Sequence, residues 1–401
     1  MFIKGISLTD HPFIKETDVA FSLPDGRNVG SGLNYIVGQS GSGKSKFLET
    51  FLPSSLSVLG VRPSQKIDKN LYLVKIFIEN DSQGGLQSKT YKEINPEQSK
   101  RIEKDFLYNS EEYEELDGTG KLSKRLRCKN RREAYYPKTF ANSGIGEARY
   151  NIIMNQIREY QRNDIVRIIM IEEPEAFLDP ENQLSIQKAL AELAITKQVF
   201  VSTHSPYLIN WQYLQNGCSV FKMNRYLSET IVGKFCDPII AAIINNPGKR
   251  NPQLNGVETK NLFFANKIFV VEGQEDVGLI TDYSRNEKYD FTFFGYGAGS
   301  NSKIENVLKL CSDLKIQKVA ALFDNNIKEG KSHYQICKKL FPEYKIEKLL
   351  AEDIRDKYGK DGQSKVGAYS YDSTNETYYL KNDEFGNDYK NKIKLIVDYF
   401  E

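Results

Sequence analysis

Gly38-Gln39-Ser40-Gly41-Ser42-Gly43-Lys44-Ser45 follows the pattern G-x-x-x-x-G-K-[ST]. The apolar residues 35–37 lead into it and residues 46–52 can begin a helix, so the expected local structure is strand, glycine loop and helix. Glycines let backbone N–H groups converge on an anion, and the helix N-terminus adds partial positive charge. All eight residues are therefore candidate nucleotide-binding residues. Lys44 is expected to reach the β- and γ-phosphates and Ser45 to hold Mg²⁺. A plain Gly/Ser-rich turn is the disfavoured alternative.

The composition indicates a soluble protein of two domains. The chain has 401 residues, of which 40% are hydrophobic and 27% charged. Because it contains no run of eighteen apolar residues and opens with no secretory signal, we expect a cytoplasmic protein with no membrane partner. The scattered cysteines include no C-x-x-C pair and are expected to be reduced; they are Cys128, Cys218, Cys236, Cys311 and Cys337. A net charge of +2 means that nucleic-acid binding would depend on local patches.

One such patch lies in a charged stretch from about 84 to 140, which we interpret as an insertion in the first domain. An acidic block at 111–117 precedes a basic block at 121–132. The candidate DNA-binding residues are Arg125, Arg127, Arg131 and Arg132. The alternative is a solvated surface insertion in which the two blocks pair with each other.

Two apolar runs further along the chain predict buried parallel strands. Residues 165–171 end in Glu172-Glu173-Pro174-Glu175, and residues 198–203 end at His204, with a helix expected between them. Carboxylates at a strand end suit Mg·ATP hydrolysis. Glu172 would complete the metal shell, Glu173 would orient the attacking water, and His204 would sense the γ-phosphate. The expected fold is therefore a parallel α/β sheet, and the expected cofactors are ATP and Mg²⁺.

These segments together resemble the motifs of ABC-type ATPases. In chain order, the phosphate loop, signature, Walker B, D-loop and switch His correspond to Gly38–Ser45, residues 143–147, Glu172–Glu175, Asp179 and His204. The E-E-P-E form and the Ser-Thr-His-Ser-Pro ending resemble the OLD (overcoming lysogenization defect) nucleases. The resemblance implies that Ser143, Gly144 and Gly146 contact ATP bound to a second subunit, and hence a homodimer or higher oligomer. The sequence departs from the pattern in having Glu172 where many ABC ATPases have Asp, and Phe177 and Asp179 where OLD proteins often have His.

A second group of acids follows the stretch 212–262, which is expected to be a connector with helical pieces and is a candidate dimerisation segment. Residues 267–271 lead into Glu272, and residues 319–323 lead into Asp324. The ends of neighbouring parallel strands share one edge of a sheet, and clustered acids with little neutralising charge favour Mg²⁺ or Mn²⁺. The alternative is that these acids are strand-end caps or surface charges.

This second group resembles a TOPRIM domain, which OLD nucleases place after their ATPase. The resemblance implies a catalytic set of Glu272, Asp276, Asp324, Asn326, Glu352 and Asp353, with metal held by Glu272, Asp324 and Asn326. Gly273 would be the close-approach glycine. Asn326 departs from the expected second acid of a D-x-D motif, and Glu352-Asp353 is the candidate third acidic position. Lys365 could stabilise charge in the transition state.

The expected fold is thus α/β, with an ABC-type P-loop ATPase domain at 1–211 (a mixed sheet with helices), the connector, and a smaller Rossmann-like TOPRIM domain with a C-terminal extension at 263–401. The resemblance implies an ATP-regulated, metal-dependent DNA endonuclease or nickase with a role in anti-phage defence, as in Gabija-type and retron-associated relatives. A helicase-like protein, or a reverse transcriptase with its nucleic acid, would be a possible partner. The alternative is an ATP-switched DNA-binding or scaffold subunit whose second domain has lost catalysis. A transporter ATPase is disfavoured, since residues 263–360 would then have no role.

Overall fold

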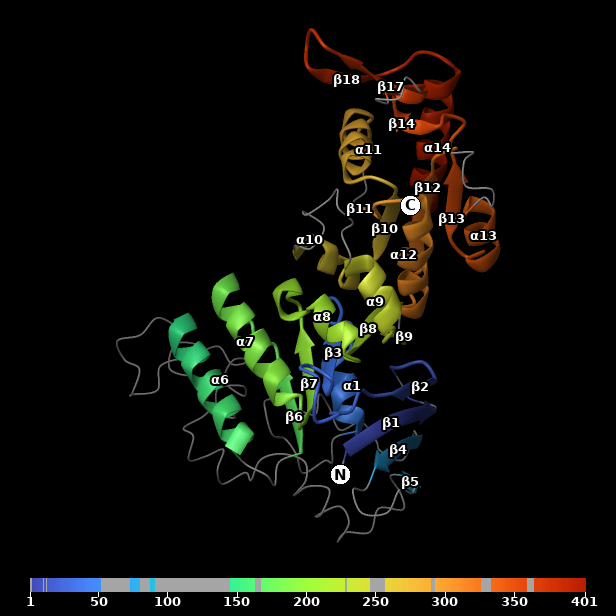
Figure 1. Ribbon diagram of the computed structural model, residues 1–401. Coiled ribbons are helices and arrows are strands. Elements are labelled where there is room, and N and C mark those ends of the chain that lie inside the picture. Colours follow the sequence, from blue (N-terminus) through green and yellow to red (C-terminus); the bar gives the residue numbers. More distant parts are fainter. Residues whose placement is uncertain are drawn as a thin grey trace. The chain divides into compact units, whose positions relative to one another are not determined.

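The computed structural model describes residues 2–9, 11, 13–51, 73–79, 87–90, 145–162, 167–227, 229–245, 257–289, 293–325, 333–358 and 364–401. The chain divides into two compact units, Met1–Ala242 and Ile243–Glu401 (Figure 1). Helix α9 (Pro238–Asn245) contains the boundary. None of the helices in the described ranges combines the length and apolarity needed to cross a membrane.

The first unit is built on a five-stranded mixed sheet in the order β6-β7-β3-β8-β9. The first four strands are parallel and the last is antiparallel to its neighbour. Their bounds are Ile168–Glu172 (β6), Gln198–Thr203 (β7), Leu33–Val37 (β3), Ser219–Tyr226 (β8) and Glu229–Phe235 (β9). All residues of β3 and β7 are buried, as expected for continuous apolar runs in the middle of a parallel sheet. The central position of β3 places the end of that strand, where the glycine loop begins, in the middle of the sheet edge.

A second, antiparallel sheet in this unit has the order β2-β1-β4-β5. Its strands are Phe2–Thr9 (β1), Thr17–Ala20 (β2), Leu73–Glu79 (β4) and Gln87–Thr90 (β5). Along the chain, the segments that connect the strands of the mixed sheet contain the helices Lys44–Phe51 (α1), Ile145–Arg162 (α6), Pro180–Leu193 (α7), Pro206–Leu208 (η4, a 3₁₀ turn) and Trp211–Gln215 (α8). An aromatic cluster joins α1 to the mixed sheet, since Phe21 lies 4.9 Å from Phe200 and 5.3 Å from Phe221 between ring centroids. Phe47 of α1 also contacts Phe21 and Phe221, so the helix after the glycine loop is anchored in the core.

The stretch 212–262 differs from the connector of helical pieces that the sequence suggested. Strands β8 and β9 lie within it, and both belong to the mixed sheet of the first unit. Polar residues obscured the strand pattern, because Lys222 and Asn224 are buried in β8. The helical part of the expectation corresponds to α9, Val257–Lys260 (α10) and Asn261–Phe263 (η6, a 3₁₀ turn).

The second unit contains a parallel four-stranded sheet in the order β11-β10-β12-β13. Its strands are Lys267–Val271 (β10), Phe294–Gly297 (β11), Lys318–Phe323 (β12) and Lys345–Lys348 (β13), and its helices are Gln274–Asn286 (α11), Asn301–Asp313 (α12), His333–Leu340 (α13) and Glu384–Phe400 (α14). A three-stranded sheet, β14-β17-β18, comprises Asp353–Arg355, Gly367–Asp372 and Thr377–Leu380. A short antiparallel pair is formed by Lys357–Tyr358 (β15) and Ser364–Lys365 (β16).

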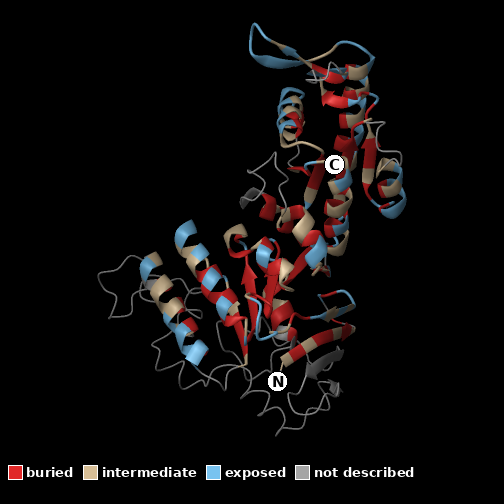
Figure 2. Cartoon of the chain, in the orientation of Figure 1, coloured by how far each residue is buried: buried red, intermediate tan, exposed pale blue. Residues whose placement is uncertain are grey.

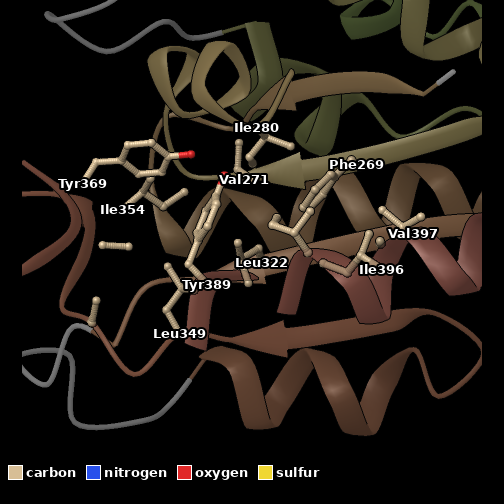
Figure 3. Packing of buried hydrophobic residues seen from close by; sticks show 14 of the residues in the cluster. Phe269, Val271, Ile280, Leu322, Leu349, Ile354, Tyr369, Tyr389, Ile396 and Val397 are labelled. Atoms are coloured by element: carbon tan, nitrogen blue, oxygen red, sulfur yellow. The ribbon is translucent and has the colours of Figure 1, made fainter. Parts of the chain in front are cut away.

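The C-terminal helix α14 completes the core of this unit (Figure 3). Its apolar residues recur at helical spacing and are buried, whereas the opposite positions are exposed (Figure 2). Tyr389 and Phe400 are fully buried and pack with Phe269 and Leu322 of the parallel sheet. Deleting a buried aromatic side chain of this size costs about 3–5 kcal/mol. The tail is therefore an integral part of the unit that carries the second group of acids.

Candidate functional site

The phosphate loop follows β3 and ends at α1. Gly38, Gly41 and Gly43 have φ angles of 153°, 77° and 98°, which side chains rarely tolerate. A β-carbon at Gly38 would lie 2.7 Å from the carbonyl oxygen of Met223. The glycines are therefore required by the backbone path as well as by the pattern of the motif.

Lys44 is buried and folded back over this loop. Its Nζ donates to the carbonyl oxygens of Gly38 (3.1 Å) and Gln39 (3.2 Å) and lies 2.7 Å from His204 Nε2. Burial lowers the pKa of Lys44, and the nearby carboxylates of Glu173, Glu175 and Glu172 oppose that effect. The strand ends of β3 and β7 thus bring the loop lysine and the predicted switch histidine together.

The predicted metal pair and the predicted catalytic acid lie beside each other at the end of β6. Ser45 Oγ donates to Glu172 Oε1 at 2.7 Å, so a hydroxyl and a carboxylate converge as a Mg²⁺ site requires. Glu173 has a φ of 44°, and its Oε1 lies 3.2 Å from His204 Nε2. A non-glycine residue in this region costs about 1–3 kcal/mol, and such strain is concentrated at functional sites.

Glu175 stabilises the other side of the same turn. Its Oε1 accepts a hydrogen bond from the backbone N–H of His204 at 2.7 Å, and burial raises the pKa of its carboxyl group. Asp179, which the motif comparison placed in the D-loop, caps α7 by accepting a hydrogen bond from the N–H of Asn182 at 2.9 Å. Both acids therefore have structural partners in addition to any role toward nucleotide.

Helix α6 contacts the turn after β6 through Gly146, which the sequence singled out, and through Arg149, which it did not. Arg149 is 8% exposed, and its Nη2 donates to the carbonyl oxygen of Glu173 at 2.9 Å. A β-carbon at Gly146 would lie 2.6 Å from the carbonyl oxygen of Phe177, so α6 packs directly on this turn. Ser143 and Gly144 lie outside the described residues. Arg149 follows the predicted signature by only a few residues, and its position in a helix with one buried face was the signal that could have identified it.

The β8–β9 hairpin supports the phosphate loop from the other side. Arg225 Nη1 donates to the carbonyl oxygen of Gly41 at 3.0 Å, and Thr230 Oγ1 donates to that of Ser42 at 2.9 Å. Neither residue was predicted, because residues 212–262 were interpreted as a connector. The described part of the loop is therefore held by two side chains about 190 residues away in sequence.

In the second unit, Glu272 follows β10 and Asp324 follows β12, and these two strands are parallel neighbours. Gly273 N–H donates to Asp276 Oδ2 at 2.8 Å at the start of α11. A β-carbon at Gly273 would lie 2.6 Å from that oxygen, which explains the glycine. The expected meeting of strand-end acids at one sheet edge is thus present in the geometry.

Three of these acids are buried. Asp276 and Asp353 are each 1% exposed and Asp324 is 7% exposed. Burial raises the pKa of Asp276 to about 6, with Arg355 opposing the rise. Burial also raises the pKa of Asp324 well above its usual range, and the negative charges of Asp353, Glu272 and Asp276 add to this effect. A divalent cation is the kind of partner that would favour the ionised form of Asp324.

The expectation of little neutralising charge was wrong. Arg355 Nε lies 3.3 Å from Asp276 Oδ1, and Lys357 Nζ contacts Asp353 Oδ2. Lys365, named from the sequence as a possible charge stabiliser, lies 3.9 Å from the same Asp353 oxygen. Within the described residues, no three Asp, Glu, His or Cys side chains converge closely enough to hold a metal ion.

The acidic pair at 352–353 is divided by the fold. Glu352 is exposed, whereas Asp353 faces the cluster of buried acids. Other predicted residues lie outside the described part of the chain, namely Asn326, Arg125, Arg127, Arg131 and Arg132. The geometry accordingly brings together Glu272, Asp276, Asp324 and Asp353 and leaves Glu352 apart.

Comparison with known proteins identifies the kind of domain in the first unit. Residues 140–209 match a protein-family model described as an AAA ATPase domain. Together with the glycine loop, this shows that the chain contains an ATPase domain of the P-loop type.

Over 198 residues the chain is 24% identical to Endonuclease GajA of Bacillus cereus (strain HuB5-5), covering 42% of this chain and 29% of that protein. The match thus spans less than a third of the length of that relative. Among solved structures, an SMC head bound to the C-winged helix domain of ScpA is 14% identical, with a TM-score of 0.40, and covers 59% of this chain and 98% of that chain. The SMC head domain from Thermotoga maritima is also 14% identical, with a TM-score of 0.36, and covers 58% of this chain and 98% of that chain.

Proposed function

We propose that this protein is an ATP-regulated, divalent-metal-dependent DNA endonuclease or nickase of the OLD type. The observation that carries the proposal is the buried carboxyl group of Asp324 beside Glu272 at the ends of adjacent parallel strands, in a chain that also has an ATPase domain. The partial similarity to an endonuclease supports the same reaction class. A role in anti-phage defence is part of the proposal.

In the ATPase domain, the loop glycines and Lys44 would bind the phosphates, and Ser45 with Glu172 would hold Mg²⁺. Glu173 would act on the attacking water, and His204 would stand beside the γ-phosphate. Its contacts with both Lys44 and Glu173 support that placement. Bound Mg²⁺ would neutralise charge that develops on the phosphate oxygens.

At the second site, Glu272 and Asp324 would hold Mg²⁺ or Mn²⁺, with Asn326 as a third ligand. Such an ion lowers the pKa of bound water and stabilises negative charge on oxygen. Asp276 and Asp353 are already paired with Arg355 and Lys357, so we assign them to orienting these cations beside the scissile phosphate rather than to metal binding. Lys365 would add positive charge at the same edge.

We further propose that two copies associate through their ATPase domains, with Ser143, Gly144 and Gly146 contacting nucleotide on the partner subunit. The described Gly146 is anchored on its own subunit, because a β-carbon there would lie 2.6 Å from the carbonyl oxygen of Phe177. ATP binding would close the dimer around DNA, with Arg125, Arg127, Arg131 and Arg132 binding its phosphates. The DNA-cutting step would therefore be controlled by nucleotide bound elsewhere in the chain.

Plasmid cleavage tests the proposal. Purified protein is expected to relax or linearise supercoiled plasmid with Mg²⁺ or Mn²⁺, and Glu272→Gln is expected to abolish cutting while leaving the circular dichroism spectrum unchanged. Glu287→Gln, an exposed acid at the end of α11, is the matched control and should cut like wild type. Equal cleavage by Glu272→Gln and wild type would rule out the assigned site.

The alternative is an ATP-switched DNA-binding or scaffold subunit whose second unit has lost catalysis. It is favoured by the pairing of Asp276 with Arg355 and of Asp353 with Lys357, which leaves fewer acids for a metal. Absence of cleavage with every divalent ion, together with DNA binding that responds to ATP and to Glu173→Gln, would select this alternative.

A further inference from the structure

An aromatic face projects from the second unit beside the buried acids. Strands β17 and β18 form an antiparallel hairpin (red in Figure 1, pale blue toward its tip in Figure 2) in which Tyr369 is opposite Leu380 and Tyr371 is opposite Tyr378. Because side chains alternate along a strand, these four share one face. Tyr369 is 6% exposed and packs on the core, whereas Tyr371 and Tyr378 are 50% and 40% exposed. The face begins in the core and ends in solvent.

The exposed part of this face is a pair of neighbouring aromatic rings. The rings of Tyr371 and Tyr378 lie 5.2 Å apart between centroids with 58° between their planes, and strand pairing places the two residues opposite each other. The buried Tyr369 continues the same face into a cluster with Tyr389. Because the two planes are inclined, a planar group would stack on the face of one ring and contact the edge of the other.

Arg355 joins this face to the acids. The centre of its guanidinium group lies 5.9 Å from the ring centroid of Tyr378, and its Nε lies 3.3 Å from Asp276 Oδ1. Lys357 and Lys365, both beside Asp353, add positive charge at the same edge. The side chain of Arg355 is 13% exposed and also lies 3.2 Å from Glu275, so a ligand on the tyrosines would meet cations that are already paired with carboxylates.

These features together favour a single-stranded nucleic-acid segment. Aromatic rings bind successive bases through their flat faces, a guanidinium group stacks on bases and rings alike, and neighbouring cations bind the backbone phosphates. We propose that Tyr371 and Tyr378, flanked by Arg355, form a platform on which an unpaired base stacks next to the bond to be cleaved. This rests on the proposed nuclease function and specifies its substrate as nucleic acid with a single-stranded segment.

Tyr379 provides a matched control. It follows Tyr378 in β18, is 53% exposed, and lies opposite Ser370, so it points from the other face of the hairpin. Replacing it removes an equally exposed tyrosine without touching the platform. Tyr378→Phe removes only the hydroxyl group and keeps the stacking surface.

The experiment is fluorescence anisotropy with the full chain in EDTA, so that no cleavage takes place. The labelled probes are a blunt DNA duplex, the same duplex with a single-stranded overhang, oligothymidylate and oligouridylate. Wild type is expected to prefer the probes with unpaired bases. The double variant Tyr371→Ala/Tyr378→Ala should lose about 5-fold to about 150-fold in affinity for them, with blunt-duplex binding unchanged. Tyr379→Ala and Tyr378→Phe should bind like wild type, and the two oligonucleotides show whether DNA or RNA is preferred.

Three results would overturn the platform: no preference for unpaired bases, an equal loss with Tyr379→Ala, or a change of oligomeric state in light scattering that shows a second copy covering this face. The binding assay requires no cleavage, so the two proposals can fail separately. If wild type does not cut plasmid but prefers probes with unpaired bases, the nuclease function is refuted and the platform stands. If wild type cuts plasmid but binds all probes equally, the platform is refuted and the nuclease function stands.

Discussion

Asp276→Asn tests how burial controls the protonation of the acids in the second unit. Burial raises the pKa of Asp276 from its usual value of 3.8 to about 6. The folded chain therefore holds the proton more tightly than the unfolded chain, so this group makes the free energy of unfolding fall as pH rises from about 4 to about 6. A pKa difference of about 2 corresponds to about 3 kcal/mol, most of which is lost between pH 4 and pH 7. Asparagine does not titrate, so the variant should escape this loss.

Urea unfolding at a series of pH values measures the effect, with the difference between wild type and variant taken at each pH. Far-UV circular dichroism follows the whole chain. Trp211 is the only tryptophan, is buried, and lies in the first unit, so its fluorescence reports on the unit without the substitution. Between pH 4 and pH 7, wild type should lose about 2–3 kcal/mol more than Asp276→Asn in the transition of the second unit. The Trp211 transition should be unaffected. A difference between the two proteins that stays constant across pH would refute the reasoning, whatever its size.

Three further predictions concern the ATPase domain and DNA binding. Arg149→Gln should reduce kcat for ATP hydrolysis by about 10-fold to about 100-fold with little change in KM, because the hydrogen bond to the Glu173 carbonyl is lost. Arg149→Lys should restore part of the turnover. Equal effects on kcat and KM would contradict this role. Arg225→Ala should raise KM for ATP by about 5-fold through a less ordered loop, measured in the same assay, and an unchanged KM would show that Thr230 alone suffices. Replacing Arg125, Arg127, Arg131 and Arg132 by Gln should make the negative slope of log K against log salt for DNA binding shallower by about 3–4. An unchanged slope would indicate a solvated insertion.

Much of the arrangement at the first site was predictable because its residues follow buried, mainly apolar strands. Glu172, Glu173 and His204 come at the ends of such runs, and a strand end fixes where the next side chains lie. The supports of the loop were not predictable in this way. Arg225 belongs to β8, whose buried Lys222 and Asn224 disguise a strand as a polar segment, and only the pairing of β8 with β3 reveals it. Tertiary context, not local pattern, decides such strands.

The second site shows how one strand can set both an acid and its counter-charge. Sequence alone does not distinguish Glu352 from Asp353, but β14 begins at Asp353, whose partner is Gly367 in β17. Alternation then directs Ile354 into the apolar core, while Asp353 and Arg355 share the opposite face. The strand pairing that buries Asp353 therefore also places Arg355 beside Asp276 and near the ring of Tyr378. A shift of one residue in this register would exchange acid, cation and core residue together, so the acids, their counter-charges and the aromatic face depend on a single strand pairing.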